Sequence, residues 1–333
     1  MTLRSSFVNF EQDARRAPPG SGRLRSTTVP ELPDLVVYLD ALTREIVGRR
    51  LDRVQLVRPF VLRSVDPPLA SLSGRVVQRV DRVGKRLVFD FGDDLFLVIH
   101  LMIAGRLKWS PAPTGTDRNP PSRQPARPGS KIVLATLEFS SGTLLFTEAG
   151  SKKRASMQVV RGAAGVRSLD PGGLEPLDAT VDEFRRALMR ESHTLKRALT
   201  DPQVFSGIGN AYSDEILHAA RLSPLKLTRS LTEEEVIRLH RATRATLLQW
   251  IERLRAAAGG TFPGKVTAFR PEMAVHGRFK QPCPVCAAPV QRIVYADNEC
   301  NYCARCQTGG RLLADRSLSR LLKSDWPRSI DDV

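Results

Sequence analysis

Four of the five cysteines in this chain of 333 residues form two closely spaced pairs near its carboxyl end. Cys283 and Cys286 are one C-x2-C pair, and sixteen residues separate them from the second pair, Cys303 and Cys306. Each pair offers two sulfurs to one ion, and the spacer is long enough for a β-hairpin, so the pattern predicts one tetrahedral Zn²⁺. The alternative is four unrelated buried or disulfide-bonded thiols, which this spacing disfavours. Cys300 falls outside the pattern and is expected to be a small packing residue.

The charge of the chain is strongly positive, with 51 Lys and Arg against 35 Asp and Glu, a formal net charge of +16. On a chain with a metal-binding pattern, this excess indicates a polyanionic partner, of which nucleic acid is the simplest. A generally arginine-rich proteome would give the same excess without such a partner. No run of eighteen apolar residues is present, so no membrane span is expected, and the few cysteines suit a reducing cytoplasm.

The hydrophobic pattern changes from strand-like to helical along the chain, which predicts an α+β protein. Residues 35–47 have helical spacing, whereas short apolar or alternating runs follow as far as residue 160 and predict an antiparallel sandwich or barrel. The predicted strands are Val54–Val57, Val76–Val80, Arg86–Phe91, Leu95–Leu101, Ile132–Phe139 and Thr143–Phe146. The predicted later helices are Asp182–Met189, Leu195–Thr200, Ala211–Ala220 and a long helix from the Thr232/Glu235 capping box to about Ala257.

These changes in pattern divide the chain into segments. Residues 1–29 have no apolar signal region and are expected to be a disordered tail or sequence that the mature protein lacks. The predicted segments that follow are a β-sandwich domain at 30–165 with a flexible loop at 110–130, a helical domain at 175–270, a zinc finger at 275–310 and a basic tail at 311–333.

A glycine-rich turn at Ser206–Asn210 precedes one of the predicted helices. The two glycines permit a tight turn, and Asn210 is expected to cap the helix that follows. The free N–H groups at the start of that helix would then face an anion such as a DNA phosphate. Taken alone, the same residues also fit an ordinary capped turn.

Five segments together resemble one known family. They are Pro30–Asp34, Gly84–Lys85, the strand-like His100–Leu107, Gly207–Glu215 and Val275–Arg278, which leads into the cysteines. In this order, they resemble the motifs of the formamidopyrimidine-DNA glycosylase/endonuclease VIII family. The resemblance spans residues 30–307.

The resemblance implies a bilobal monomer of the bacterial cytoplasm and nucleoid that repairs damaged double-stranded DNA by base excision. The flipped-out nucleotide would be attacked at C1′ by the amine of Pro30, giving an iminium, base release and strand cleavage. Glu31 would be the acid/base beside the sugar, and Lys85 and Asn210 would hold phosphates. The four cysteines would hold a structural zinc ion, because four sulfurs leave no open position for catalysis.

The printed sequence conflicts with this chemistry at one bond, because Pro30 follows Val29 and its nitrogen is therefore an amide. We favour the interpretation that Val29 is encoded by a GTG start codon, is translated as Met and is removed. The rival interpretation is a genuine extension that is cleaved off or that makes the protein inactive.

Three departures from the family pattern bear on DNA binding. Ile103 stands where the family has a wedging Met, no Arg-Phe pair is visible near residues 150–156, and Asn298 replaces a phosphate-binding Arg. The basic tail after Gln307 is also unusual. These departures predict a DNA grip or a lesion spectrum that differs from that of the best-known members. The main alternative function, which a retained Val29 would support, is a non-catalytic binder of damaged or abasic DNA. A weaker alternative, which rests only on charge, is an RNA-binding zinc-ribbon protein.

Overall fold

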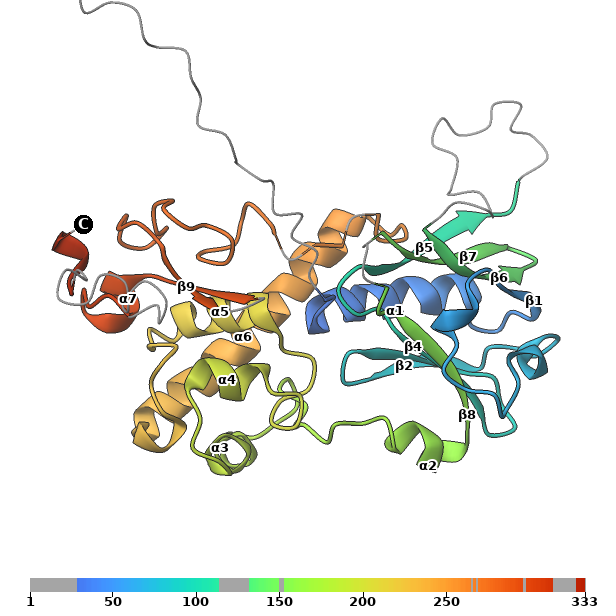
Figure 1. Ribbon diagram of the computed structural model, residues 1–333, viewed down its shortest axis with the longest axis horizontal. Coiled ribbons are helices and arrows are strands. Elements are labelled where there is room, and N and C mark those ends of the chain that lie inside the picture. The colour runs from blue at the N-terminus through green and yellow to red at the C-terminus, as the bar shows by residue number, and fades with distance from the viewer. Residues whose placement is uncertain are drawn as a thin grey trace, which may run out of the picture.

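The computed structural model describes residues 29–113, 132–149, 153–264, 266–267, 269–295, 298–313 and 328–332. These residues form two lobes joined by an extended segment between α2 (Gly162–Arg167) and α3 (Val181–Met189) (Figure 1). Residues 1–28, most of the predicted loop at 110–130 and part of the predicted tail lie outside the described residues.

The first lobe is a sandwich of two antiparallel sheets, so the predicted fold class is confirmed. One sheet has the order β1 (Leu51–Leu56), β6 (Val133–Phe139), β7 (Gly142–Glu148), β5 (Gly105–Pro111). The other has the order β2 (Arg79–Val83), β3 (Arg86–Asp90), β4 (Leu95–His100), β8 (Ser156–Arg161). Alternate side chains of both sheets meet α1 (Leu32–Ile46) in one apolar core.

The second lobe is helical and encloses its own apolar core. It contains α3, α4 (Leu195–Thr200), α5 (Asn210–Ala219) and α6 (Glu233–Ala258). Helix α6 begins at the predicted Thr232/Glu235 capping box and ends at Gly259, which has a left-handed φ of 55°. Short 3-10 helices lie at Pro59–Val61, Leu69–Leu72, Thr228–Ser230 and Ile330–Asp332.

The four cysteines belong to a small finger that packs on the helical lobe. Its hairpin consists of β9 (Gln291–Tyr295) and β10 (Asn298–Tyr302), and α7 (Ala304–Thr308) follows directly. Ile330, near the end of the sequence, packs on the finger and is buried with Tyr302 and Leu312. The backbone N–H of Ile330 donates to the Gly310 carbonyl at 2.8 Å, so residues 328–332 pack on the finger and Ile330 completes its core.

The sequence interpretation was wrong about the connection between β4 and β5. The segment His100–Leu107 is not one strand, because residues 101–104 form a turn in which Met102 has a φ of 51°. The N–H of Gly105 donates to the Leu101 carbonyl at 2.8 Å, and a Cβ at position 105 would lie only 2.2 Å from that oxygen. Glycine therefore permits the close turn that separates the two strands.

Other strand boundaries differ from the prediction for simpler reasons. The predicted strand Val76–Val80 is displaced to β2, because Val76 instead forms an isolated bridge with Arg50. Strand β8 was not predicted, although its burial alternates at Met157 and Val159. Its pairing with β4 is a long-range contact that the local pattern did not reveal.

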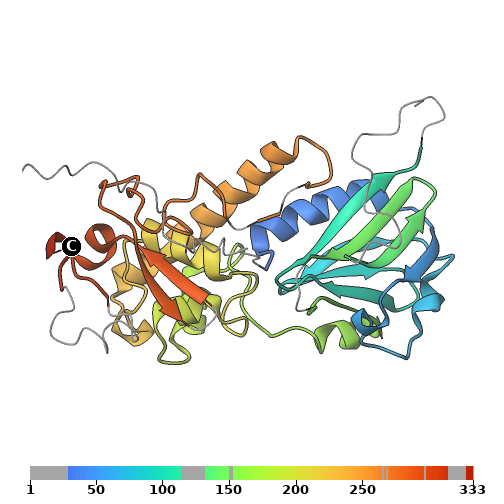
Figure 2. The ribbon, with the colours of Figure 1, turned by 45° about the horizontal axis from the view of Figure 1, so that its top comes forward.

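Helix α1 joins the two lobes. Its first residue, Leu32, is buried in the helical core, whereas Leu35 is buried in the sandwich core. The N–H of Leu32 donates to the Gly207 carbonyl at 2.9 Å, and Arg255 of α6 pairs with Asp40 of α1 at 2.8 Å. Figure 2 shows α1 and α6 side by side at the junction of the lobes.

We expect Gly207→Ala to be much more destabilising than Gly48→Ala. Both glycines have a left-handed φ, 78° and 77°, at which a side chain costs about 1–2 kcal/mol. A Cβ at position 207 would also lie 2.7 Å from the Cβ of Leu32, whereas position 48 has open space. Overpacking should add about 1–3 kcal/mol at position 207. Urea denaturation of both variants measures this difference, and equal losses of stability would contradict the packing at Leu32.

Candidate active site and metal centre

The carboxylate of Glu31, which is 2% exposed, sits on the amino-terminal end of α5. It accepts hydrogen bonds from the backbone N–H groups of Gly209 (2.7 Å), Ala211 (2.9 Å) and Tyr212 (3.2 Å). The first N–H groups of a helix have no partner within the helix, and the helix dipole favours a negative charge at this end. The anion at the start of α5 is therefore a side chain from the other lobe.

This arrangement corrects the expectation that Asn210 caps α5. The N-cap residue is Gly209, Asn210 is the first helical residue, and no side-chain cap hydrogen bond is present there. Glu31 accepts the hydrogen bonds from the N–H groups of Ala211 and Tyr212 that a capping side chain would otherwise accept. The carbonyl of Asn210 accepts from the Lys196 ammonium at 2.7 Å.

Lys85 meets Glu31 at the same turn. A Cβ at position 209 would lie 2.7 Å from the Lys85 Nζ and 2.5 Å from the Glu31 Cδ, so only glycine leaves room for both side chains. Burial lowers the pKa of Lys85, and Lys196 adds to this effect, whereas Glu31 opposes it. Lys85 follows Gly84 in the turn between β2 and β3, and both lobes therefore contribute to this cluster.

A second buried carboxylate supports the Glu31 backbone. The Glu31 N–H donates to Asp34 at 3.1 Å, and Asp34 pairs with Arg270 at 2.9 Å. Burial raises the pKa of Asp34 to about 6, although the positive charge of Arg270 opposes the change. Pro30, which is also buried, directly precedes this pair of carboxylates.

Helix α5 carries two further buried acids that the sequence analysis did not single out. Asp214 accepts from the Lys196 ammonium at 2.6 Å, His276 Nδ1 at 2.8 Å and the Asn301 N–H at 3.1 Å. Burial alone would raise the pKa of Asp214, but Lys196 and the His276 hydrogen bond outweigh it and hold this pKa below its ordinary value. No local pattern in the sequence indicates this burial, because the partners of Asp214 lie at residues 196, 276 and 301.

Glu215 attaches the segment before the finger to the same helix. It accepts from the backbone N–H groups of Ala274 (2.7 Å), Val275 (2.9 Å) and His276 (2.9 Å). Together, Asp214 and Glu215 fix both the hairpin and the segment leading into it against α5.

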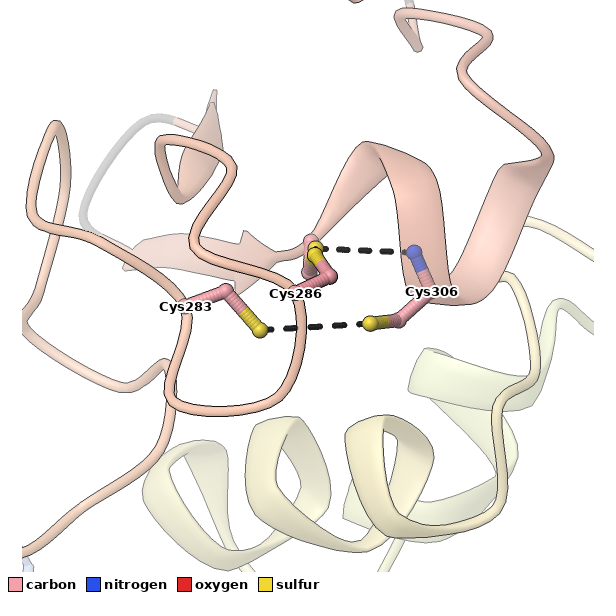
Figure 3. A group of neighbouring side chains, drawn as sticks. Cys283, Cys286 and Cys306 are labelled. Atoms are coloured by element: carbon pink, nitrogen blue, oxygen red, sulfur yellow. Dashed lines mark hydrogen bonds between the residues drawn. The ribbon is translucent and has the colours of Figure 1, made fainter.

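The structure brings the four predicted metal ligands together. Their sulfurs all lie within 4.8 Å of one another, with Cys283 and Cys306 separated by 3.9 Å and Cys286 and Cys303 by 3.4 Å. Figure 3 shows the Cys283 and Cys306 thiols facing one another. Tetrahedral bonds of about 2.3 Å place sulfurs about 3.8 Å apart, so the four cysteines fit a metal ion. Cys300 is buried in the finger core, with its pKa raised by burial.

Comparison with known proteins agrees with this geometry. Residues 29–150 match the model of the formamidopyrimidine-DNA glycosylase N-terminal domain, and residues 173–259 match that of the formamidopyrimidine-DNA glycosylase H2TH domain. The chain is 31% identical over 293 residues to formamidopyrimidine-DNA glycosylase of Symbiobacterium thermophilum, covering 84% of this chain and 89% of that protein. This chain belongs to the formamidopyrimidine-DNA glycosylase family.

Solved structures of formamidopyrimidine-DNA glycosylases (Fpg) superimpose on most of the chain. The MutM (Fpg) protein of Thermus thermophilus is 32% identical with a TM-score of 0.67, covering 84% of this chain and 98% of that one. Lactococcus lactis Fpg, in a complex with DNA containing an oxidised pyrimidine, is 28% identical with a TM-score of 0.70, covering 84% and 100%.

Two predicted DNA-binding residues, Ile103 and Asn298, come from other segments of the chain than Glu31 and Lys85. Ile103 is half-buried on the turn between β4 and β5, and its carbonyl accepts from Arg106 at 3.1 Å. Asn298 begins β10 and pairs with Tyr295, and its side chain lies outside the described residues. Within the described part of this family member, no helix is long and apolar enough to cross a membrane.

The titration of Asp34 predicts a specific pH dependence of stability. Its folded pKa of about 6 lies above the ordinary 3.8, so the folded state binds a proton more tightly than the unfolded state. The resulting stabilisation is fully present below about pH 4 and is lost as pH rises through about 6. Relative to Asp34→Asn, the wild-type free energy of unfolding should therefore fall across this window by up to about 3 kcal/mol. Urea denaturation at several pH values tests this, and a constant or rising difference would contradict it.

The metal centre predicts opposite outcomes for two cysteine variants. Cys283→Ser should lower the bound metal per chain and unfold the finger, because metal binding supplies folding energy. Cys300→Ser should retain the metal, because this thiol lies in the finger core rather than among the four ligands. Elemental analysis of the purified proteins measures both, and full metal content in Cys283→Ser would disprove the assignment.

Proposed function

We propose that this member of the family is a base-excision-repair DNA glycosylase and AP lyase that removes oxidised bases from double-stranded DNA. The observation that carries the proposal is the convergence of Lys85 and of Glu31, the residue directly after Pro30, on the start of α5, where the two lobes meet. Relatives with this fold have been solved in complexes with DNA containing FAPY-dG, an oxidised pyrimidine or an abasic site. The positive charge of the chain suits the same partner.

Pro30 is the proposed nucleophile. The lone pair of its amine forms a bond to C1′ of the flipped nucleotide, and the bond from C1′ to the base breaks with its electrons leaving on the base. After the amine loses its proton and the sugar ring opens, an iminium joins the protein to the sugar. Loss of a C2′ proton then expels the 3′ phosphate and cuts the strand. This chemistry requires a free secondary amine, so Pro30 must be the first residue of the active protein.

Glu31 is the proposed acid/base for the sugar. Its two oxygens accept three backbone hydrogen bonds, which fix the carboxylate beside Pro30. A proton on this group could be delivered to the sugar ring oxygen as the ring opens. The α5 amino terminus thus positions the group that moves protons.

Lys85 and Asn210 are the proposed phosphate contacts near the flipped nucleotide. A phosphate would stabilise the ammonium of Lys85, whose pKa is lowered by burial. Ile103 is the proposed apolar wedge into the gap left by the base, and Asn298 is the proposed phosphate donor on the finger. One zinc ion held by the four cysteines would support the finger without taking part in the reaction. We propose that the protein acts as a monomer on the bacterial nucleoid.

A non-catalytic binder of damaged or abasic DNA is the second candidate. The bond from Val29 to Pro30 favours it, because an amide nitrogen cannot attack C1′. The two candidates differ in one property, namely whether a covalent adduct forms.

Borohydride trapping distinguishes these candidates. Protein that begins at Pro30 should form a trapped adduct with an oxidised-base duplex, whereas protein that retains residues 1–29 should bind the duplex without forming one. Intact-mass measurement verifies each amino terminus. Efficient trapping by the full 333-residue chain would disprove the role of Pro30, and absence of an adduct from both forms over a panel of lesions would favour the binder.

Glu31→Gln tests the acid/base role in protein that begins at Pro30. We expect base release in single turnover to fall by at least about 100-fold, the usual contribution of general acid–base catalysis. The control is Glu45→Gln, which alters a partly exposed carboxylate in α1, the helix that follows Glu31. This variant should retain wild-type base release. Because Gln would place an amide N–H against the α5 backbone, the free energy of unfolding and the affinity for the duplex are measured alongside. Wild-type base release by a folded Glu31→Gln variant would contradict the assignment.

A further inference from the structure

A histidine on α5 reaches the metal centre from outside the finger. His218, in the last turn of α5, is only 6% exposed, and its Nε2 lies 3.3 Å from the Sγ of Cys283. The other hydrogen bonds to the ligand sulfurs come from within the finger, including the Val285 N–H to Cys283 and the Cys306 N–H to Cys303, both 3.5 Å. Among the described residues, no other side chain from outside the finger forms a hydrogen bond with a ligand sulfur.

The chemistry of the two groups decides which is the donor. A thiolate bound to a metal ion has no hydrogen, so Cys283 can only accept. The hydrogen must therefore be on Nε2 of His218, and the ring donates it to the sulfur. A donor facing an anionic acceptor forms one of the stronger hydrogen bonds in proteins.

His218 does not need to be a ligand itself. Four sulfurs already lie within 4.8 Å of one another and complete a tetrahedral set. The ring nitrogen contacts one of these sulfurs, which is the arrangement of a group that orients a ligand and adjusts its charge.

We propose that His218 is a positioning residue of the metal centre, donating a hydrogen bond from Nε2–H to the Cys283 thiolate. This inference rests on the proposed zinc ion. The hydrogen bond withdraws electron density from the sulfur, so the sulfur reacts more slowly with electrophiles and the site retains its metal longer. The bond also connects the metal centre to α5, the helix whose other end holds Glu31.

Two substitutions separate the hydrogen bond from simple packing. His218→Phe keeps a ring of similar size but removes the donor, whereas the amide nitrogen of His218→Gln can occupy nearly the place of Nε2. We expect His218→Phe to transfer zinc to an excess of a chromophoric chelator about 10–100-fold faster than wild-type, and His218→Gln to restore most of the difference. His193→Phe, in the loop before α4, is the control and should match the wild-type rate.

Cobalt substitution gives a readout that packing alone would not move. In the Co²⁺ protein, loss of the hydrogen bond raises the energy of the sulfur electrons, so the sulfur-to-cobalt charge-transfer band should shift to longer wavelength in His218→Phe and return in His218→Gln. Equal zinc-transfer rates and unchanged bands in a folded His218→Phe variant would overturn the proposal. A wild-type spectrum typical of three sulfurs and one nitrogen would also overturn it, because His218 would then be a ligand.

A measurement on the unaltered full chain keeps the proposal testable if His218→Phe fails to fold. In ¹¹³Cd-substituted protein, a hydrogen bond to the metal-bound sulfur should produce a scalar coupling between ¹¹³Cd and the Nε2 proton of His218. Absence of that coupling, in protein whose cadmium is bound by four cysteines, would overturn the proposal. Failure of the wild-type chain to bind any of the three metals would instead disprove the zinc site itself.

Discussion

The hydrogen bonds between the Glu31 carboxylate and the first N–H groups of α5 are the interaction on which the arrangement of the two lobes depends. They join the start of the sandwich lobe to the middle of the helical lobe, and they bury a charge that needs this compensation. Gly209 has no side chain because Glu31 and Lys85 occupy the space where one would lie. The proposed catalytic group is therefore positioned by the same contacts that hold the lobes together.

Helix α5 makes further contacts with distant parts of the chain along its length. Glu31 binds its first turn, Asp214 and Glu215 bind the hairpin and the segment before it, and His218 in the last turn contacts Cys283. Each buried charge has several hydrogen-bonding partners, which is the condition under which burial of an ion is tolerated. A single helix thus sets the position of the finger relative to the Glu31 cluster.

Much of this structure could be predicted from the sequence, because its signals are local. The cysteine spacing predicted the ligand set, the Thr232/Glu235 capping box predicted the start of α6, and the alternating runs predicted the sandwich. The features that were missed depend on residues far apart in the chain. Asn210 looked like a cap because the competing acceptor, Glu31, lies about 180 residues earlier. Similarly, the partners of Asp214 come from three separate segments, so its burial had no local signal.

The packing of residues 328–332 on the finger has a consequence for the order in which the protein can fold during synthesis. Domains generally fold from the amino terminus as the chain emerges, and the sandwich has all its described strands by residue 161. Asp214 and Glu215, in contrast, emerge long before the backbone groups of residues 274–301 that they bind. Ile330, which fills the finger's core, follows every metal ligand. Of the described units, the finger must therefore be the last to close. Until then Glu215 lacks its backbone partners at residues 274–276, and Asp214 has Lys196 but not yet His276 or Asn301.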